Sequence, residues 1–150
     1  FEVVHTAVLQ GDLAAYHAFG IEKTPLNYDH MLDIVFTNPQ VARVGLTEKE
    51  LKKRKIEYIT AEYPFDDHGK SILMEAKQGF VRLFGEKPTG KIIGAEIVSK
   101  DAGELIHALS VAVSHGLTAA SLLQTHWYHP TLSEIISYPL EDIVDELAVQ

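Results

Sequence analysis

The chain has 150 residues, of which 46% are hydrophobic and 23% charged, a composition typical of a folded domain with a substantial buried core. Its formal net charge of −8 argues against a nucleic-acid partner, because affinity for phosphate backbones comes largely from clustered Lys and Arg. No apolar run approaches the ~20 residues of a membrane span, so we expect no membrane partner.

Cysteine is absent, and no secretory signal is visible, so we expect a cytoplasmic protein without disulfides of its own. The chain starts at Phe1 rather than Met, which indicates a piece of a longer polypeptide. Its one basic cluster, Lys52–Lys55, is short. It is predicted to be the cationic end of a helix, where positive side chains face the negative end of the helix dipole.

The first predicted element is a helix from Phe1 to Gly20, in which apolar residues recur near helical spacing. A second, short helix is expected after Thr47, which has capping-box spacing to Glu50. Most of the β-rich stretches should pair antiparallel, and the last two should be joined by a hairpin at Gly85–Gly90. The predicted strands are Asp33–Phe36, Ile56–Phe65, Ser71–Ala76, Gly79–Phe84 and Lys91–Val98.

Helices return in the C-terminal third of the chain. The first begins at Asp101, which has capping-box spacing to Glu104, and ends at Gly116 as a left-handed cap. Further helices are predicted at Thr118–Leu123, from Thr131 to a stop at Pro139, and at Leu140–Val149. A terminal helix, several strands and then helices on one side predict an α+β fold with an antiparallel sheet of about five strands.

The run from Thr125 to Glu134 carries the most distinctive chemistry of the chain. His129 can accept a proton near neutral pH, and the carboxylate of Glu134 could orient its ring and stabilise the imidazolium. Thr131 and Glu134 also have capping-box spacing, so Glu134 taken alone would more often be a helix-start device. The pair is half of a general-base system, because no obvious nucleophile for it to deprotonate is present.

A zinc site has to be weighed because His126 and His129 are close in sequence and His107 and His115 are also available. These histidines lie on different predicted elements, and no cysteine accompanies them. We therefore expect no metal site.

A set of motifs connects the chain to a known family. It comprises Phe36–Thr47, Gly94–Ile106 and His129–Glu134. In order and spacing these resemble the carboxy-terminal dimerisation domain of the pyridine nucleotide-disulfide oxidoreductases, the family of dihydrolipoamide dehydrogenase and the mercuric-reductase-like proteins. The resemblance assigns residues 24–150 to that domain and residues 1–23 to the terminal helix of a missing FAD domain.

The resemblance implies that the intact protein is a homodimeric enzyme using FAD and NAD(P)H, cofactors that this fragment alone would not bind. His129 matches the base that the family lends to the partner subunit's active site, and Glu134 matches the carboxylate that orients it. The substrate would be a small-molecule or protein disulfide or thiol. The backbone of Val3, Val4 and His5 would approach the flavin, although a solvent-facing His5 is about as plausible.

Three points stay open at this stage. The resemblance implies a cis His129–Pro130 bond. Trp127 and Tyr128 stand where many dihydrolipoamide dehydrogenases have small residues, so they either add bulk beside a substrate channel or dimer seam, or simply fill core or interface space. The alternative function is a non-catalytic, stand-alone homodimerisation module that buries the apolar faces of the Asp101–Gly116 and Leu140–Val149 helices against a second copy.

Overall fold

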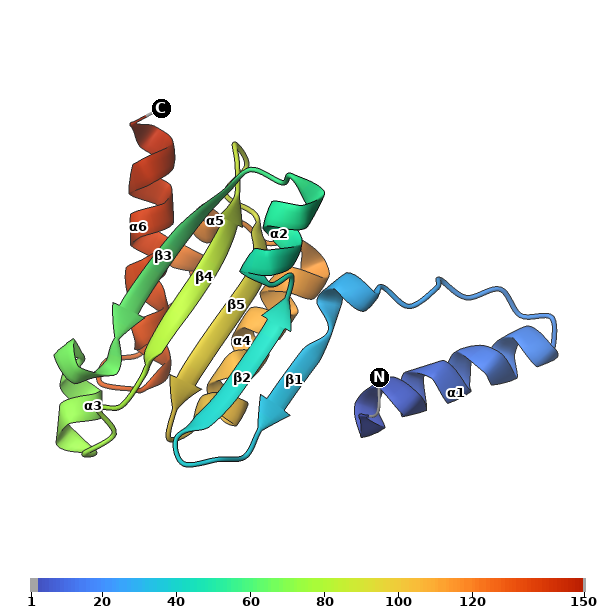
Figure 1. Ribbon diagram of the computed structural model, residues 1–150, viewed down its shortest axis with the longest axis horizontal. Helices are drawn as coiled ribbons and strands as arrows, with labels where there is room; N and C mark the ends of the chain where they lie inside the picture. The colour runs from blue at the N-terminus through green and yellow to red at the C-terminus, as the bar shows by residue number, and fades with distance from the viewer. Residues whose placement is uncertain (1–2, 150) are drawn as a thin grey trace.

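The computed structural model describes residues 3–149, and within them five strands form one antiparallel sheet in the order β1-β2-β5-β4-β3 (Figure 1). The strands are β1 (Leu32–Val35), β2 (Gln40–Gly45), β3 (Tyr58–Pro64), β4 (Phe80–Glu86) and β5 (Ile92–Ser99). The helices are α1 (Val4–Ala18), α2 (Glu48–Arg54), α3 (Gly69–Leu73), α4 (Ala102–His115), α5 (Ala119–Leu123) and α6 (Ser137–Ala148), with 3-10 turns η1 (Tyr28–His30), η2 (Phe65–Asp67) and η3 (Ser133–Ile136). The predicted α+β class is confirmed.

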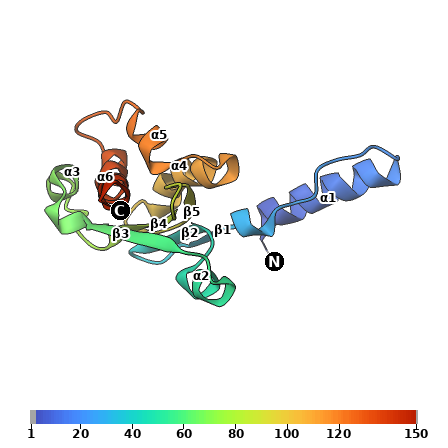
Figure 2. The same ribbon diagram turned by 90° about the horizontal axis from the view of Figure 1, so that it is seen from above.

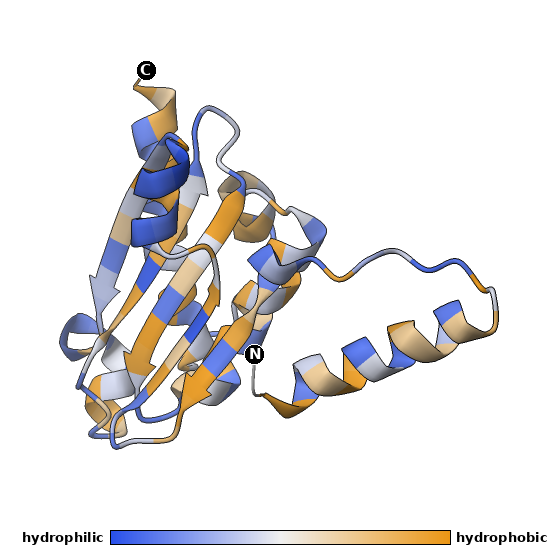
Figure 3. Ribbon diagram, turned by 45° about the vertical axis from the view of Figure 1, so that its right-hand side comes forward, coloured by the Kyte–Doolittle hydropathy of each residue, from blue (hydrophilic) through white to orange (hydrophobic). Residues whose placement is uncertain are grey.

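The sheet separates two unequal layers of helix. Helices α4, α5 and α6 lie on one face, and α2 lies on the other (Figure 2). The main core fills the first layer, where buried residues of β2, β4 and β5 meet the apolar stripes of α4 and α6. A smaller core of Leu46, Leu51 and Phe84 lies under α2. The strands carry mostly hydrophobic residues, interrupted by polar ones (Figure 3).

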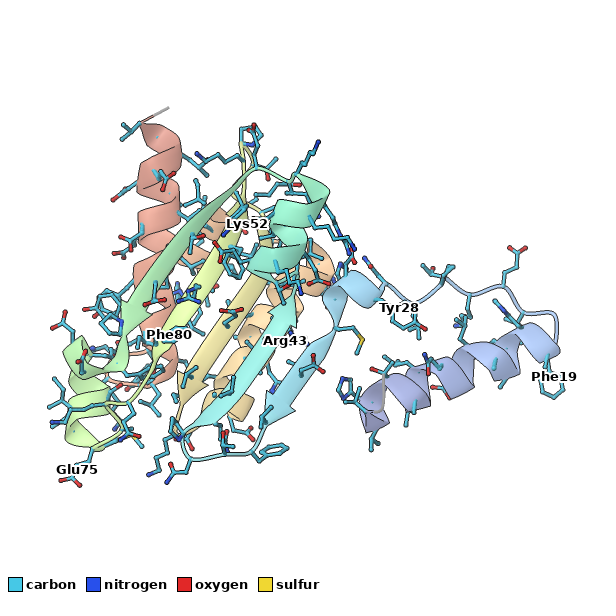
Figure 4. All side chains as sticks on the ribbon, viewed as in Figure 1. Phe19, Tyr28, Arg43, Lys52, Glu75 and Phe80 are labelled. Atoms are coloured by element: carbon cyan, nitrogen blue, oxygen red, sulfur yellow. The ribbon has the colours of Figure 1, made fainter. Side chains whose placement is uncertain are left out.

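A row of charged side chains crosses the face of the sheet opposite α4, with one residue from each strand in register. We call this set the charged row: Asp33, Arg43, Glu96, Arg82 and Glu62. Arg43 pairs with Asp33 at 2.7 Å, and Arg82 bridges Glu62 at 2.6 Å and Glu96 at 3.0 Å. Arg43 is labelled on β2 in Figure 4. Each charge of the row therefore has a neighbour of opposite sign.

Helix α1 lies apart from the sheet and is joined to it by an extended segment (Figures 1 and 3). Thr6 is the one buried residue of α1 within the described chain. The contacts of α1 with the rest of the molecule include a hydrogen bond from Gln10 Nε2 to Tyr28 Oη at 2.8 Å. Phe19, just after the helix, is 84% exposed. Neither α1 nor any other helix within residues 3–149 combines the length and apolar character needed to cross a bilayer.

Two strand assignments differ from the prediction. Ser71–Ala76 is wrong as a strand, because α3 occupies residues Gly69–Leu73. Strands β3 and β4 pair with each other along their whole length, and β3 is an edge strand, so the segment between them forms the connection and adds no strand to the sheet. Conversely, β2 (Gln40–Gly45) is not among the predicted strands, yet it pairs with both β1 and β5.

One predicted capping box and one predicted helix end also need correction, although Asp101 is the N-cap of α4 as expected. Asp101 makes no side-chain cap; instead, Gln40 Oε1 on β2 accepts a hydrogen bond from the Gly103 N–H at 2.9 Å. Pro139 does not stop a helix, because it lies in the first turn of α6, where a missing N–H costs little. The capping box at Thr47, the hairpin at Gly85–Gly90 and the left-handed cap at Gly116 are confirmed.

The apolar faces of α4 and α6 are present as predicted, but they pack against the sheet of their own chain. Leu105, Leu109, Leu140 and Ile143 are all buried. The expectation that these two faces would bury themselves against a second copy is therefore wrong, because one molecule already covers them.

Candidate active site

His129 and Glu134 lie together on the connection from α5 to α6. Nδ1 of His129 is 2.9 Å from Oε2 of Glu134, within hydrogen-bond distance. The His129 side chain is 79% exposed, whereas that of Glu134 is 10% exposed. The predicted cis His129–Pro130 bond is present. An exposed imidazole is thus held by a carboxylate that is itself embedded in the domain, with its Nε2 edge available to a proton donor.

Backbone hydrogen bonds hold Glu134 in place at the start of η3. Its N–H donates to Thr131 Oγ1 at 3.3 Å, and its carbonyl accepts from Ser137 Oγ at 2.8 Å. The predicted capping box is therefore half formed, because the threonine caps the turn while the Glu134 carboxylate does not reach back to it. The carboxylate oxygens are directed instead to imidazoles.

A second imidazole, that of His68, reaches the same carboxylate from between η2 and α3. Its Nε2 lies 3.4 Å from Oε1 of Glu134, which is ion-pair distance but too long for a well-formed hydrogen bond. Its Nδ1 is 2.8 Å from Oγ of Ser71 on α3. The His68 side chain is 1% exposed. In both views α3 lies beside the start of α6, which brings these residues together (Figures 1 and 2).

Burial lowers the pKa of His68, although the negative charge of Glu134 opposes the shift. His68 is therefore a neutral imidazole at neutral pH. It was not among the predicted site residues. The three-residue spacing of His68 and Ser71 is typical of the first turn of a helix and is a weak signal for a contact between them. The prediction of a strand at Ser71–Ala76 was incompatible with that signal.

Trp127 and Tyr128 have different environments. Trp127 packs on the main core, and its Nε1–H donates to the carbonyl of Leu122 at 3.2 Å, so it fills core space. Tyr128 is 79% exposed next to His129 in the sequence. The bulk predicted beside the candidate site therefore comes from Tyr128.

Val3, Val4 and His5 lie elsewhere in the molecule. They line a hollow of about 500 Å³ between the start of α1 and strand β1, together with His107. Val3 provides no side-chain cap for the helix. The first N–H groups of α1 have no partner within the helix, and the residues that carry them border this hollow. None of the residues that line this hollow belongs to the His129 connection.

The histidines considered for zinc are not gathered. His107 is engaged within α4, where its Nδ1 is 2.8 Å from the Gly103 carbonyl oxygen. Within residues 3–149, no group of three or more His, Cys, Asp or Glu side chains is arranged to hold a metal ion.

Comparison with known proteins connects this geometry to one family. Residues 31–139 match the family model described as pyridine nucleotide-disulphide oxidoreductase, dimerisation domain. The chain is 34% identical over 133 residues to dihydrolipoyl dehydrogenase of Bacillus subtilis (strain 168), covering 89% of this chain and 28% of that protein. It is 35% identical over 111 residues to the mitochondrial dihydrolipoyl dehydrogenase of Pisum sativum, covering 74% of this chain and 22% of the relative.

Solved structures agree with these matches. LpdA from Mycobacterium tuberculosis superimposes with a TM-score of 0.88 at 30% identity, over 95% of this chain and 31% of that chain. The HOCl-induced flavoprotein disulfide reductase RclA from Escherichia coli shares the fold, with a TM-score of 0.77 at 20% identity over 87% of this chain and 30% of that one. The chain thus spans about a quarter of the length of its curated relatives.

Proposed function

Because the chain belongs to the dimerisation-domain family of the pyridine nucleotide-disulphide oxidoreductases, we propose that the intact protein is a homodimeric disulfide oxidoreductase of the dihydrolipoamide dehydrogenase type. In this proposal residues 24–150 form the dimerisation domain, and residues 1–23 end an FAD domain. The substrate is a small-molecule or protein disulfide or thiol, and the protein is cytoplasmic.

The observation that carries the proposal is the 2.9 Å contact between exposed His129 and embedded Glu134. Glu134 accepts a hydrogen bond from Nδ1–H, which fixes the tautomer and leaves the lone pair on Nε2. We assign His129 as the base that removes a proton from a thiol in the partner subunit's active site. The thiolate is the form that attacks a disulfide, and the imidazolium returns the proton to the leaving sulfur. Glu134 stabilises the imidazolium between these steps.

FAD and NAD(P)H belong to the proposal as cofactors of the intact protein. The start of α1, which has no side-chain cap, suits the flavin, because the backbone of Val3, Val4 and His5 at the positive end of the helix dipole would approach an electron-rich ring. When bound, the flavin would carry electrons between the nicotinamide and a disulfide. The chain's own contribution to the chemistry is the proton held by His129.

A stand-alone homodimerisation module is the alternative function. The chain offers less for it, because the helix faces that would serve as its interface are buried within one molecule. Size-exclusion chromatography with light scattering on residues 1–150 shows whether the chain dimerises by itself.

The test of the proposed base is His129→Ala in the intact protein. Loss of a positioned base should slow the half-reaction with the thiol substrate by a factor on the order of 10²–10⁴ while flavin content is unchanged. Stopped-flow absorbance of the flavin measures the rate. His126→Ala is the matched control, because His126 is an exposed histidine on the same connection. A normal rate in His129→Ala would refute the assigned role.

A further inference from the structure

The Glu134 carboxylate has two imidazole neighbours, and the proposed function uses only one of them. His68 is as buried as the core residues, with Nε2 3.4 Å from Oε1 of Glu134, whereas exposed His129 contacts Oε2. In the described part of the chain, His68 Nε2 and Ser99 Oγ are the buried side-chain polar atoms that lack a hydrogen-bond partner. A buried, incompletely bonded ring nitrogen directed at a functional carboxylate calls for an explanation.

The carboxylate selects the tautomer of His68. If Nδ1 carried the proton, the lone pair of Nε2 would face the negative charge of Glu134, which is repulsive. The favourable arrangement places the proton on Nε2, directed toward Glu134, with Ser71 donating its hydroxyl hydrogen to Nδ1 at 2.8 Å. Ser71, His68, Glu134 and His129 then form one continuous chain of polar contacts from α3 to the molecular surface.

A neutral donor suits this location better than a cation. A buried carboxylate is stabilised in its charged form by an N–H group, yet a full positive charge would compete with the imidazolium that forms on His129. Burial lowers the pKa of His68 and keeps the ring neutral in the range where the base works.

We propose that His68 is a positioning residue that shares the Glu134 carboxylate with His129, tempers its hold on the imidazolium, and thereby sets the pH at which His129 accepts a proton. The inference rests on the proposed function, in which His129 is the base. It assigns no contact between His68 and the substrate, since His68 acts through Glu134.

Other titratable groups face His68 from the elements packed around it. The Tyr138 ring on α6 is 6.1 Å away in an edge-on arrangement and stacks on Tyr63 of β3 at 4.2 Å. The Tyr63 hydroxyl donates to Asp67 Oδ2 at 3.0 Å, and burial together with this bond raises the pKa of Tyr63 to about 12. Tyr63 therefore stays neutral over the working range. Glu134 and His129 are the nearby groups whose charge His68 would influence.

The direction of the effect follows from competition for one carboxylate. When the His68 N–H is removed, Glu134 concentrates its hydrogen bonding on His129 and stabilises the imidazolium more strongly. Because His129 must be neutral to take a proton from a thiol, the acidic limb of the pH–rate profile moves to higher pH.

The experiment compares pH–rate profiles of the thiol half-reaction in the intact protein, measured by stopped flow. His68→Leu removes the donor and should shift the acidic limb upward by about 0.5–1 pH unit. His68→Gln supplies an amide N–H near the position of Nε2 and should restore the wild-type profile. Ser99→Ala is the matched control at another buried polar group without a partner, and its profile should match that of wild type.

Two outcomes overturn the inference: a His68→Leu profile that superimposes on wild type, or equal shifts in His68→Leu and His68→Gln. If His68→Leu does not accumulate as a flavoprotein, Ser71→Ala decides. Loss of the hydroxyl should cause a smaller upward shift, and an unshifted profile refutes the inference. His129→Ala separates the two proposals, because a normal rate in that variant contradicts the base itself, whereas a slow one beside an unshifted His68→Leu contradicts only the role of His68.

Discussion

Glu134 has two structural roles, and they can be separated by mutation. Its backbone N–H is capped by Thr131, while its carboxylate serves His129. In Glu134→Gln the imidazolium on His129 loses its counter-charge, so the thiol half-reaction should slow on the order of tenfold. Stopped-flow kinetics on the intact protein measures this.

Thr131→Ala is the complementary variant. Losing the hydroxyl should lower the free energy of unfolding by about 0.5–1 kcal/mol, as for other cap removals, whereas Glu134→Gln keeps the backbone bond. Urea denaturation of the two variants compares them. Equal losses of stability would show that the carboxylate itself supports the turn.

The contact between His129 and Glu134 could be predicted from the sequence, whereas the contact between His68 and Glu134 could not. His129 and Glu134 share one short segment, so their contact follows from local geometry. His68 joins them only because the connection between β3 and β4 folds against the start of α6. No periodicity in one sequence marks such a tertiary contact.

Among the elements, α2 has the most complete set of local signals. Thr47 Oγ1 accepts from the Glu50 N–H at 3.3 Å, and Glu50 Oε2 accepts from the Thr47 N–H at 2.9 Å. The basic residues of its last turn were predicted to be a helix end, and there Arg54 forms an ion pair with Asp29. Propensity, cap and charge agree here, which is why this helix could be predicted.

Thr47→Ala should lower the free energy of unfolding by about 1 kcal/mol at pH 7. The bond from the Thr47 backbone, followed by that from its hydroxyl, lowers the pKa of Glu50 below its ordinary value of 4.5. A lowered carboxyl pKa stabilises the fold above pH 4.5, and this stabilisation is lost as the pH falls through the folded-state pKa. Urea titrations at pH 7 and pH 3.5 should therefore show a smaller deficit at acid pH. Thr47→Ser, which keeps the hydroxyl, is the control.

The mispredicted elements lack that agreement. Ile72 and Leu73 look like strand residues, but both are exposed and lie in α3, the short helix of the connection between β3 and β4. Strand β2 is short and alternates polar with apolar residues, and it is recognisable mainly by the partners on either side of it. Gln40, at its start, caps α4 from a distant part of the sequence, which no local pattern could indicate.

For the whole molecule, the structure separates a sheet domain from a loosely attached helix. Removing residues 1–23 should leave the melting temperature of the sheet domain within a few degrees, because α1 contributes one buried residue among those described. Far-UV circular dichroism of residues 24–150 and 1–150 compares the transitions. A large fall in melting temperature on truncation would place α1 within the same cooperative unit and contradict the proposed domain division.

The charged row has a consequence for how the strands find their alignment. If a strand shifts by two residues relative to its neighbour, its inward-facing side chains still face inward. Burial of apolar side chains in the core therefore distinguishes poorly between the native register and the shifted one. On the outer face the same shift would place Arg43 opposite Val35 instead of Asp33, or Arg82 opposite Val98 instead of Glu96. The shifted arginine would then lose its ion pair and lie beside an apolar side chain. The ion pairs on the outer face of the sheet thus favour the native register over a two-residue shift that packing of the core hardly disfavours.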